Sequence, residues 1–379
     1  MVSHQHPLAE VLKGISVAHL GGNLSEFTVR ILGDLGARIV TVQPEKPSTD
    51  SRTEEAHSAI RQAHYTAGAE TRTTVEESTA LIELLSQHEV VINACEGGSS
   101  VPVLSAQQAT ALREKNPEVL ICHITPYGLN GPWAGRPASD LTLLAAGGFM
   151  GSCGYDDGVE AGLPVAATGG QVNHVTGMIA AIAILGALLQ QGQQPRASGR
   201  VLDISAQHAL AVSTEMAIPY WDYTGQEVIR HTGRHAMPRQ TPRWQHPCGD
   251  GKHLLALPLY IDDRRFAALK EWMESEGFDH GLDDEKYQRS QTRELHMFDV
   301  VDAIRRFASL NDSGWMFIEA QKRKLPWAPV NTPFECVEDS HFTRHRTTIE
   351  EISEGERTIR RVRLPFLISG ATAEKGHEE

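Results

Sequence analysis

An alternation of short apolar runs with helical patterns constrains the fold of this chain more than any other feature. The runs are rich in β-branched residues and too short for core helices, and amphipathic patterns lie between them. The expected strands are residues 14–20, 37–42, 89–93 and 119–124. Strands that alternate with helices form a parallel sheet with helices on both faces. The first half of the sequence therefore predicts a doubly wound, Rossmann-like α/β domain.

The turn after the first expected strand is not of the dinucleotide-binding kind. Residues 21–25 read GGNLS, which lacks the GxGxxG spacing that cradles a pyrophosphate at a helix N-terminus. Gln43 stands where an acidic residue would bind the ribose. The pattern therefore argues against dinucleotide binding.

The acidic charge excludes other classes of ligand. With 35 Lys and Arg against 48 Asp and Glu, the formal net charge is −13, which repels nucleic acid and anionic membranes. Any anionic ligand needs a local basic site.

The cysteines and the apolar segments favour a cytoplasmic protein. Five cysteines are widely scattered, with no CxxC pair and no zinc-like spacing, so we expect reduced thiols and no metal. The N-terminus has no basic flank or apolar core of a secretory signal. The longest apolar run, residues 175–189, is shorter than the ~20 residues of a membrane span and predicts a buried helix.

Four segments, in order, resemble the family III CoA-transferases, a group that includes formyl-CoA transferase, carnitine CoA-transferase and the α-methylacyl-CoA racemases. The first contains the family's D-L-G-A signature as Asp34-Leu35-Gly36-Ala37, and the last contains its Pro-x-x-Pro-Val segment. The segments are residues 12–20 with 31–44, then 124–150, 176–210 and 325–339. Together they cover about a quarter of the chain, in the family's order.

The resemblance implies a fold and an assembly. Family members have a Rossmann-like large domain and a small α+β domain, and they form interlocked dimers with active sites at the shared interface. For this chain we expect the large domain at 1–222, a linker at 223–247, the small domain at 248–324, and a return to the large domain with a charged tail at 325–379.

The most important departure is at the family's nucleophile. The resemblance places that aspartate four residues before the glycine that opens the central helix. Here the glycine is Gly177 and the residue four before it is Asn173. An amide cannot form the acyl anhydride that this chemistry requires, and loss of a covalent nucleophile costs on the order of 10³-fold in rate.

Two other interpretations of this region are weaker or purely structural. Asn173 is also a good helix N-cap. His174 has a suitable pKa for a base, but adjacent side chains point apart, so we do not expect it to share the site. The racemases carry a histidine before their Asp-Leu segment, where this chain has Ser139 before Asp140.

Other departures fall on ligand-facing elements. Ser25-Glu26 replaces the family's Gly-Pro, and residues 63–68 do not match its CoA-holding loop of Asn, Arg and Lys. Residues 95–98 replace an Arg-Pro-Gly turn, and the family's last helix is not recognisable.

Candidate CoA and substrate contacts follow from position and from the resemblance. Phosphate binding needs Arg or Lys near the carboxyl ends of strands. The candidates are Arg38, Arg52, Arg72, Arg136, Tyr127, Gly128 and Asp140, with Arg136 in the family-like GRPASD segment. Gly147-Gly148 either admits a ligand or forms a bend between packed helices.

The sequence thus predicts a CoA-transferase-family subunit that handles acyl-CoA thioesters and carboxylic acids. We expect it to be the nucleophile-free member of a hetero-oligomer, inactive alone, whose homologous partner carries the aspartate. The alternatives are an active transferase substituted at 173 and a non-catalytic CoA-binding or scaffold protein. No tightly bound cofactor is expected, and CoA or acyl-CoA would be a substrate.

Overall fold

The computed structural model describes residues 10–44, 60–61, 63–74, 78–94, 104–156, 158, 162–193, 200–214, 216–257, 262–345, 349–354 and 357–366. The chain divides into two compact units. The first comprises Met1–Met150, Ala166–Glu215 and Ser340–Glu379, and the second comprises Gly151–Val165 and Met216–Asp339. The segments expected to be the linker and the small domain both lie in the second unit, together with residues 325–339.

The first unit is built on a six-stranded parallel sheet, as predicted. Its strand order is β3-β2-β1-β4-β5-β6, and every neighbouring pair is parallel. The strands are β1 (Ser16–Leu20), β2 (Arg38–Pro44), β3 (Glu70–Thr74), β4 (Val90–Ala94), β5 (Leu120–Thr125) and β6 (Val201–Ser205). Strand β3 was not predicted from the sequence, because its ETRTT sequence has no apolar run, as befits a strand at the edge of the sheet.

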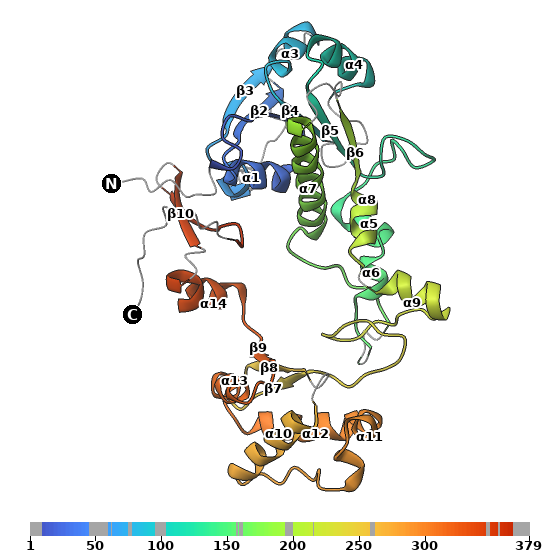
Figure 1. Cartoon of the computed structure of the whole chain (residues 1–379), viewed down its shortest axis with the longest axis vertical. Helices are drawn as coiled ribbons and strands as arrows, with labels where there is room; N and C mark the ends of the chain where they lie inside the picture. The colour runs from blue at the N-terminus through green and yellow to red at the C-terminus, as the bar shows by residue number, and fades with distance from the viewer. Residues whose placement is uncertain are drawn as a thin grey trace. The chain divides into compact units, whose positions relative to one another are not determined.

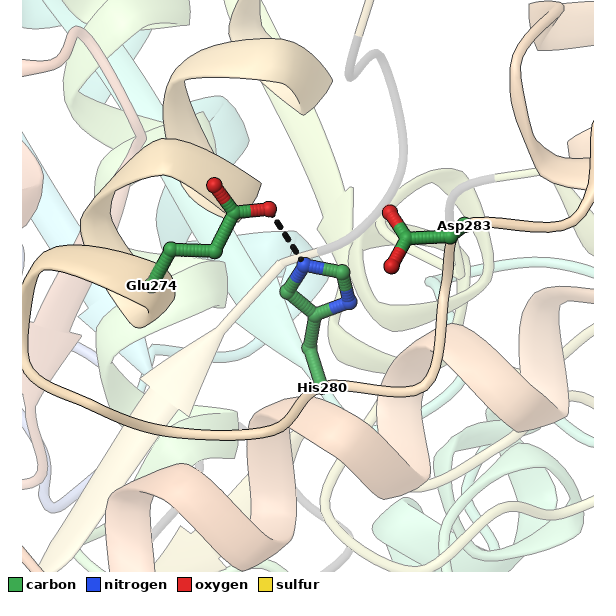
Figure 2. A group of neighbouring side chains, drawn as sticks. All are labelled: Glu274, His280 and Asp283. Carbon is green, nitrogen blue, oxygen red and sulfur yellow. Dashed lines mark hydrogen bonds and ion pairs between the residues drawn. The ribbon is translucent and has the colours of Figure 1, made fainter.

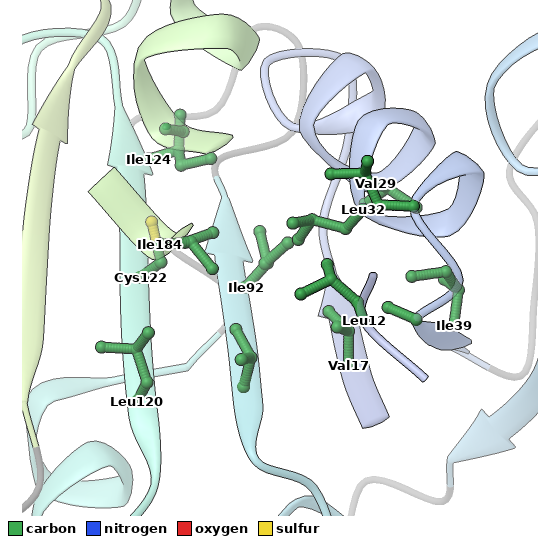
Figure 3. Close-up of a cluster of buried hydrophobic side chains, with 14 of the residues drawn as sticks. Leu12, Val17, Val29, Leu32, Ile39, Ile92, Leu120, Cys122, Ile124 and Ile184 are labelled. Atoms are coloured by element: carbon green, nitrogen blue, oxygen red, sulfur yellow. The ribbon is translucent and has the colours of Figure 1, made fainter. Parts of the chain in front are cut away.

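Helices cover both faces of this sheet, which explains why its inner strands are apolar throughout. Alternate strand residues such as Val17 and Ile92 pack with α1 (Glu26–Asp34) and α7 (Gln171–Gln193), as Figure 3 shows. The intervening residues pack with α3 (Ser78–Leu85) and α4 (Ala106–Lys115). The turn after β1 requires Gly21, which has φ +102°, because a Cβ there would lie 2.2 Å from the Ala94 carbonyl oxygen.

Helix α7 is the predicted buried helix. By length and composition it could cross a membrane, and 44% of its most apolar window is buried. It packs against α1 and against β5 and β6 (Figure 1), so α7 serves as a core helix of the first unit.

Shorter elements complete the first unit. They are α5 (Asp140–Ala146), α8 (Ala206–Val212), a π-helical turn (His341–His345) and the antiparallel hairpin of β10 (Ile349–Glu354) and β11 (Arg357–Val362). Helix α6 (Phe149–Ser152) has its first two residues in the first unit and its last two in the second. The sequence after β6 predicts a single helix over 206–217, but this prediction was wrong, because α8 ends at Val212 and a separate helix begins at Ala217. Gly147 proves to be a packing position, since a Cβ there would lie 2.6 Å from the Leu210 Cβ.

The second unit has its own sheet and core. Strands β7 (Gln245–Pro247), β8 (His253–Ala256) and β9 (Trp327–Pro329) form an antiparallel sheet. Its helices are α9 (Ala217–Thr224), α10 (Asp263–Ser275), α11 (Ser290–Leu295), α12 (Met297–Ser309), α13 (Ser313–Lys322), α14 (Pro333–Glu338) and the short 3₁₀ turn η2 (Glu285–Tyr287). Trp272, Phe307 and Trp327 lie fully buried at the centre, which gives the Pro-x-x-Pro-Val segment a packing role.

Candidate functional site

Asn173 lies in the first turn of α7, with its side chain buried. Because α7 begins at Gln171, Asn173 is inside the helix, and the N-cap interpretation of this residue was wrong. The residue is only 7% exposed. Within the described part of the chain, its Oδ1 atom has no hydrogen-bond partner.

A close approach of α1 and α7 builds the surroundings of Asn173. A Cβ at Gly177 would lie 2.8 Å from the Phe27 Cβ, so only glycine permits this contact. The Thr28 hydroxyl donates to the Gly177 carbonyl at 3.2 Å. The first turn of α1, which follows β1 at the carboxyl edge of the sheet, is thereby held beside the second turn of α7.

Tyr65 joins the two neighbouring residues of α7. Its phenol oxygen lies 3.4 Å from Nε2 of His174 and also forms a hydrogen bond with the side chain of Asn173. Burial and the charge of Glu26 raise the pKa of Tyr65, so its phenol is neutral. The expectation that residues 173 and 174 would diverge was wrong in this respect, because both reach Tyr65. The His174 ring also packs edge-on to Phe27, with centroids 4.6 Å apart.

A carboxylate and a guanidinium form an ion pair near Tyr65. Glu26, the first residue of α1, forms an ion pair with Arg61. Burial raises the pKa of Glu26, and the Arg61 charge opposes that rise. The Arg61 guanidinium also lies 5.8 Å from the centre of the Tyr65 ring. We call Glu26, Arg61, Tyr65, Asn173 and His174 the polar cluster.

A second charged network explains the D-L-G-A signature. Asp34 accepts a hydrogen bond from Arg361 of β11 at 2.8 Å and lies 3.6 Å from Arg30. Arg30 also donates to the Val362 carbonyl and lies 2.6 Å from Nε2 of His64. Burial and the charges of Arg30 and Arg361 lower the pKa of His64 to about 4. Asp34 therefore anchors the C-terminal hairpin on α1.

Asp140 reaches the same end of α7 from another helix. It is the first residue of α5, and its carboxylate accepts a hydrogen bond from the backbone N–H of Val172. Burial raises the pKa of Asp140. Of the residues predicted from the sequence, Asp140 and Asn173 are thus brought together.

The other predicted residues lie in separate groups. Tyr127 packs edge-on to Trp133, with centroids 5.3 Å apart, and the Arg136 guanidinium lies 5.3 Å from the centre of the Trp133 ring. Gly128 has φ +91° and donates to the Thr125 hydroxyl at 2.8 Å.

Two of the predicted basic residues share an acidic partner. Glu70 lies 3.7 Å from Arg38 and 2.7 Å from Arg72. Arg38 begins β2, at the amino edge of the sheet, and its side chain is exposed. Arg52 and residues 95–98 lie outside the described residues.

Sequence reasoning did not select Glu26, Arg61 and Tyr65 as site residues. The available signal was the set of departures that the resemblance implies, since it places Glu26 at the family's Gly-Pro and leaves the 63–68 segment with Tyr65 unmatched. Those departures meet in space around Asn173.

One group of possible metal ligands occurs among the described residues, in the second unit (Figure 2). The ligand atoms of Glu274, His280 and Asp283 lie within 4.8 Å of one another. The Leu282 N–H donates to Nδ1 of His280 at 2.9 Å, so the neutral ring carries its hydrogen on Nε2, which is 3.0 Å from Glu274. Nε2 therefore has no free lone pair for a metal.

The comparisons with known proteins identify the family. The sequence profile of CoA-transferase family III matches residues 12–377. The chain belongs to the family III CoA-transferases. A crystal structure of a CaiB/BaiF family protein from Brucella suis has the same fold, with a TM-score of 0.73, 21% identity, and coverage of 96% of this chain and 93% of that one.

Two curated family III CoA-transferases are similar in sequence. One is succinyl-CoA:(R)-benzylsuccinate CoA-transferase subunit BbsE of Thauera aromatica, 27% identical over 72% of this chain and 66% of that one. The other is the succinate–glutarate CoA-transferase of Agrobacterium fabrum, 26% identical over 94% of this chain and 89% of that one. Both names describe transfer of CoA to or from dicarboxylic acids.

Proposed function

We propose that this chain is the nucleophile-free subunit of a hetero-oligomeric CoA-transferase that moves CoA between an acyl-CoA thioester and a carboxylic acid. The proposal is supported by the buried amide of Asn173 beside Tyr65. The resemblance in sequence implies that this is the position of the family's aspartate. A homologous partner supplies that aspartate. The first acids to test are dicarboxylic acids, because both curated relatives are named for them.

The covalent step explains why a partner is needed. In the family reaction a carboxylate attacks the thioester carbonyl, the CoA thiolate leaves, and a mixed anhydride forms. The thiolate then attacks the enzyme's carbonyl carbon, which releases the acyl group as a carboxylate and leaves an enzyme-bound thioester for the acceptor acid. The amide of Asn173 has no anionic oxygen to begin this sequence. Glu26, the carboxylate of the polar cluster, is ion-paired with Arg61.

An apolar stripe on α7 supports association with another chain. Met178, Ile182 and Leu189 lie on one face of the helix, and their side chains are 46%, 66% and 67% exposed. Exposed apolar stripes of this kind mark protein interfaces. One of the curated relatives is itself named as a subunit.

The proposal is tested by co-expression with a homologous, aspartate-bearing chain, followed by size exclusion, native mass spectrometry and a CoA-transfer assay. We expect a stable mixed assembly that transfers CoA, and no transfer by this chain alone. Ile182→Glu should prevent the mixed assembly, whereas the matched control Gln190→Glu, on an exposed position of the same helix, should not. A homodimer of this chain with full activity would refute the proposal.

A further inference from the structure

Helix α1 and the C-terminal hairpin both hold the segment that carries Tyr65. Two guanidinium groups, one from each of these elements, meet at His64, the residue before Tyr65. Nη1 of Arg30 in α1 lies 2.6 Å from the His64 ring nitrogen Nε2, and Arg361 of β11 donates to the His64 carbonyl oxygen at 3.5 Å. The side chain and the backbone of His64 are therefore both tied to charged groups from outside its own segment.

The two guanidinium groups are themselves fixed in place. Arg30 and Arg361 share Asp34 as an acidic partner, and Arg30 also donates to the carbonyl oxygen of Val362. The Arg30 side chain is 6% exposed and the Arg361 side chain is 10% exposed. Leu364, just after the hairpin, packs in the same hydrophobic core as α1 and α7. The hairpin is thus docked by apolar packing as well as by charge, and it presents Arg361 from a fixed position.

Tyr65 carries this hold to the first turn of α7. Its ring packs edge-on to the His64 ring, with centroids 4.6 Å apart, and its phenol oxygen lies 3.4 Å from Nε2 of His174. Among the described residues from 60 to 66, the buried apolar side chain is the small one of Ala63. An alanine makes few contacts in a core, so apolar packing alone does not fix the backbone that carries the phenol.

The ion pair of Arg61 with Glu26 is a weaker tether of the same segment. The Arg61 side chain is 43% exposed, whereas the Arg361 side chain is 10% exposed. Solvent and salt screen the interactions of exposed charges far more than those of buried ones. The contacts that reach His64 should therefore dominate the position of Tyr65.

We infer that Arg361 is a positioning residue of the candidate site: through His64 it fixes the Tyr65 phenol beside His174 at the first turn of α7. Arg361 is 297 residues away from His64 in the sequence, so the C-terminal hairpin supports the site as well as being anchored on α1. This inference rests on the proposed function only for the meaning of this end of α7. It concerns the geometry of this chain alone, and it holds or fails independently of the partner chain.

A fluorine label on Tyr65 in the full chain tests the inference. With 3-fluorotyrosine at position 65, fluorine NMR is recorded on the natural chain and on Arg361→Gln, and hydrogen exchange of residues 60–68 is followed by mass spectrometry. In Arg361→Gln we expect the fluorine signal to shift towards that of the unfolded chain, because the ring leaves its place beside His174. Loss of one hydrogen bond to a charged group should also raise the exchange of this segment about tenfold.

Arg363→Gln is the matched control, since it removes the same charge at the end of the same hairpin. Arg363 pairs with Glu350, an acid that Arg361 also contacts. Within the described part of the chain, Arg363 makes no hydrogen bond with His64. The fluorine signal and the exchange of residues 60–68 should therefore stay as in the natural chain.

Two results would overturn the inference. One is an equal fluorine shift in Arg363→Gln and Arg361→Gln, because the loss of charge would then explain both. The other is a lower Tm of Arg361→Gln with an unchanged fluorine signal, which is the result of a merely structural role. If Arg361→Gln does not fold, Arg361→Lys replaces it, since lysine keeps the charge beside Asp34 but lacks the planar fork that also reaches His64. A shifted signal in Arg361→Lys supports the inference, and an unchanged one contradicts it.

Discussion

The contact between α1 and α7 has two ends, and they restrict the amino-acid sequence in different ways. At the packing end, defined by Phe27, Thr28 and Gly177, the chain keeps the family's glycine. At the polar end, defined by the polar cluster, the sequence predicts that Asn173 and Glu26 stand in place of the family's aspartate and Gly-Pro. At the packing end only glycine fits at position 177, because any Cβ there collides with α1. The polar end accepts any set of side chains whose charges and hydrogen bonds balance.

The largest expected effect comes from breaking the packing end. Gly177→Ala places a Cβ 2.8 Å from the Phe27 Cβ and displaces the Thr28 hydrogen bond, so we expect a loss of about 3 kcal/mol in the free energy of unfolding. Gly186→Ala is the matched control, because a Cβ there meets no atom within 4 Å. The control should gain about 1 kcal/mol from helix propensity. Denaturant unfolding measures both, and equal effects would show that α1 and α7 can separate freely.

The next effect concerns the other end of α1. Asp34→Ala leaves Arg361 and Arg30 without their shared acid in a half-buried site, and we expect a loss of about 2 kcal/mol. The exposed pair between Glu70 and Arg72 provides the control, since Glu70→Gln should cost less than about 1 kcal/mol. If the two variants lose equal stability in urea, the Asp34 network is not an anchor for the C-terminal hairpin.

This difference between packing and polar residues also decides what the sequence could predict. The strands β1, β2, β4 and β5 were predictable because burial on both faces demands unbroken apolar runs. The edge strand β3 was not, because a half-solvated edge imposes no apolar pattern. The break between α8 and α9 was also missed, since both sides of it have helical composition.

The pH dependence of unfolding should carry a smaller contribution from His64. Its pKa is lowered from 6.5 to about 4 in the folded chain, so the unfolded chain binds the proton more readily between these values. The stabilising contribution of neutral His64 is therefore fully present above pH 6.5 and is lost as the pH falls towards 4. Because His64 is partly solvated, we expect its share to be about 1 kcal/mol.

His64→Gln tests this share, because glutamine can still accept the hydrogen bond from Arg30. Between pH 7 and pH 4.5, the free energy of unfolding of the variant should fall by about 1 kcal/mol less than that of the natural chain. Urea unfolding at each pH measures this difference. A parallel pair of pH profiles would mean that His64 does not stay neutral in the fold.

The candidate site was predictable only where the resemblance supplied a position. Asn173 and Asp140 were named from the sequence, and the structure places both at the first turn of α7. Glu26, Arg61 and Tyr65 come from segments far apart in the sequence, and nothing in their spacing indicates that they meet. Their contact depends on the α1–α7 approach that Gly177 permits, which is a property of the fold and not of any local pattern.

The smallest expected effect concerns CoA binding by the isolated chain. Arg38 and Arg72, two of the predicted phosphate contacts, are both paired with Glu70. Residues 63–68 do not match the basic loop that the resemblance implies. We expect Arg72→Ala to change the CoA affinity by less than about twofold, because a phosphate contact that is not made cannot be lost. Isothermal titration of the natural chain should give a Kd weaker than about 1 μM, equivalent to about −8 kcal/mol. A tighter constant, or a tenfold loss in Arg72→Ala, would show that the chain alone has a CoA site, which contradicts this prediction.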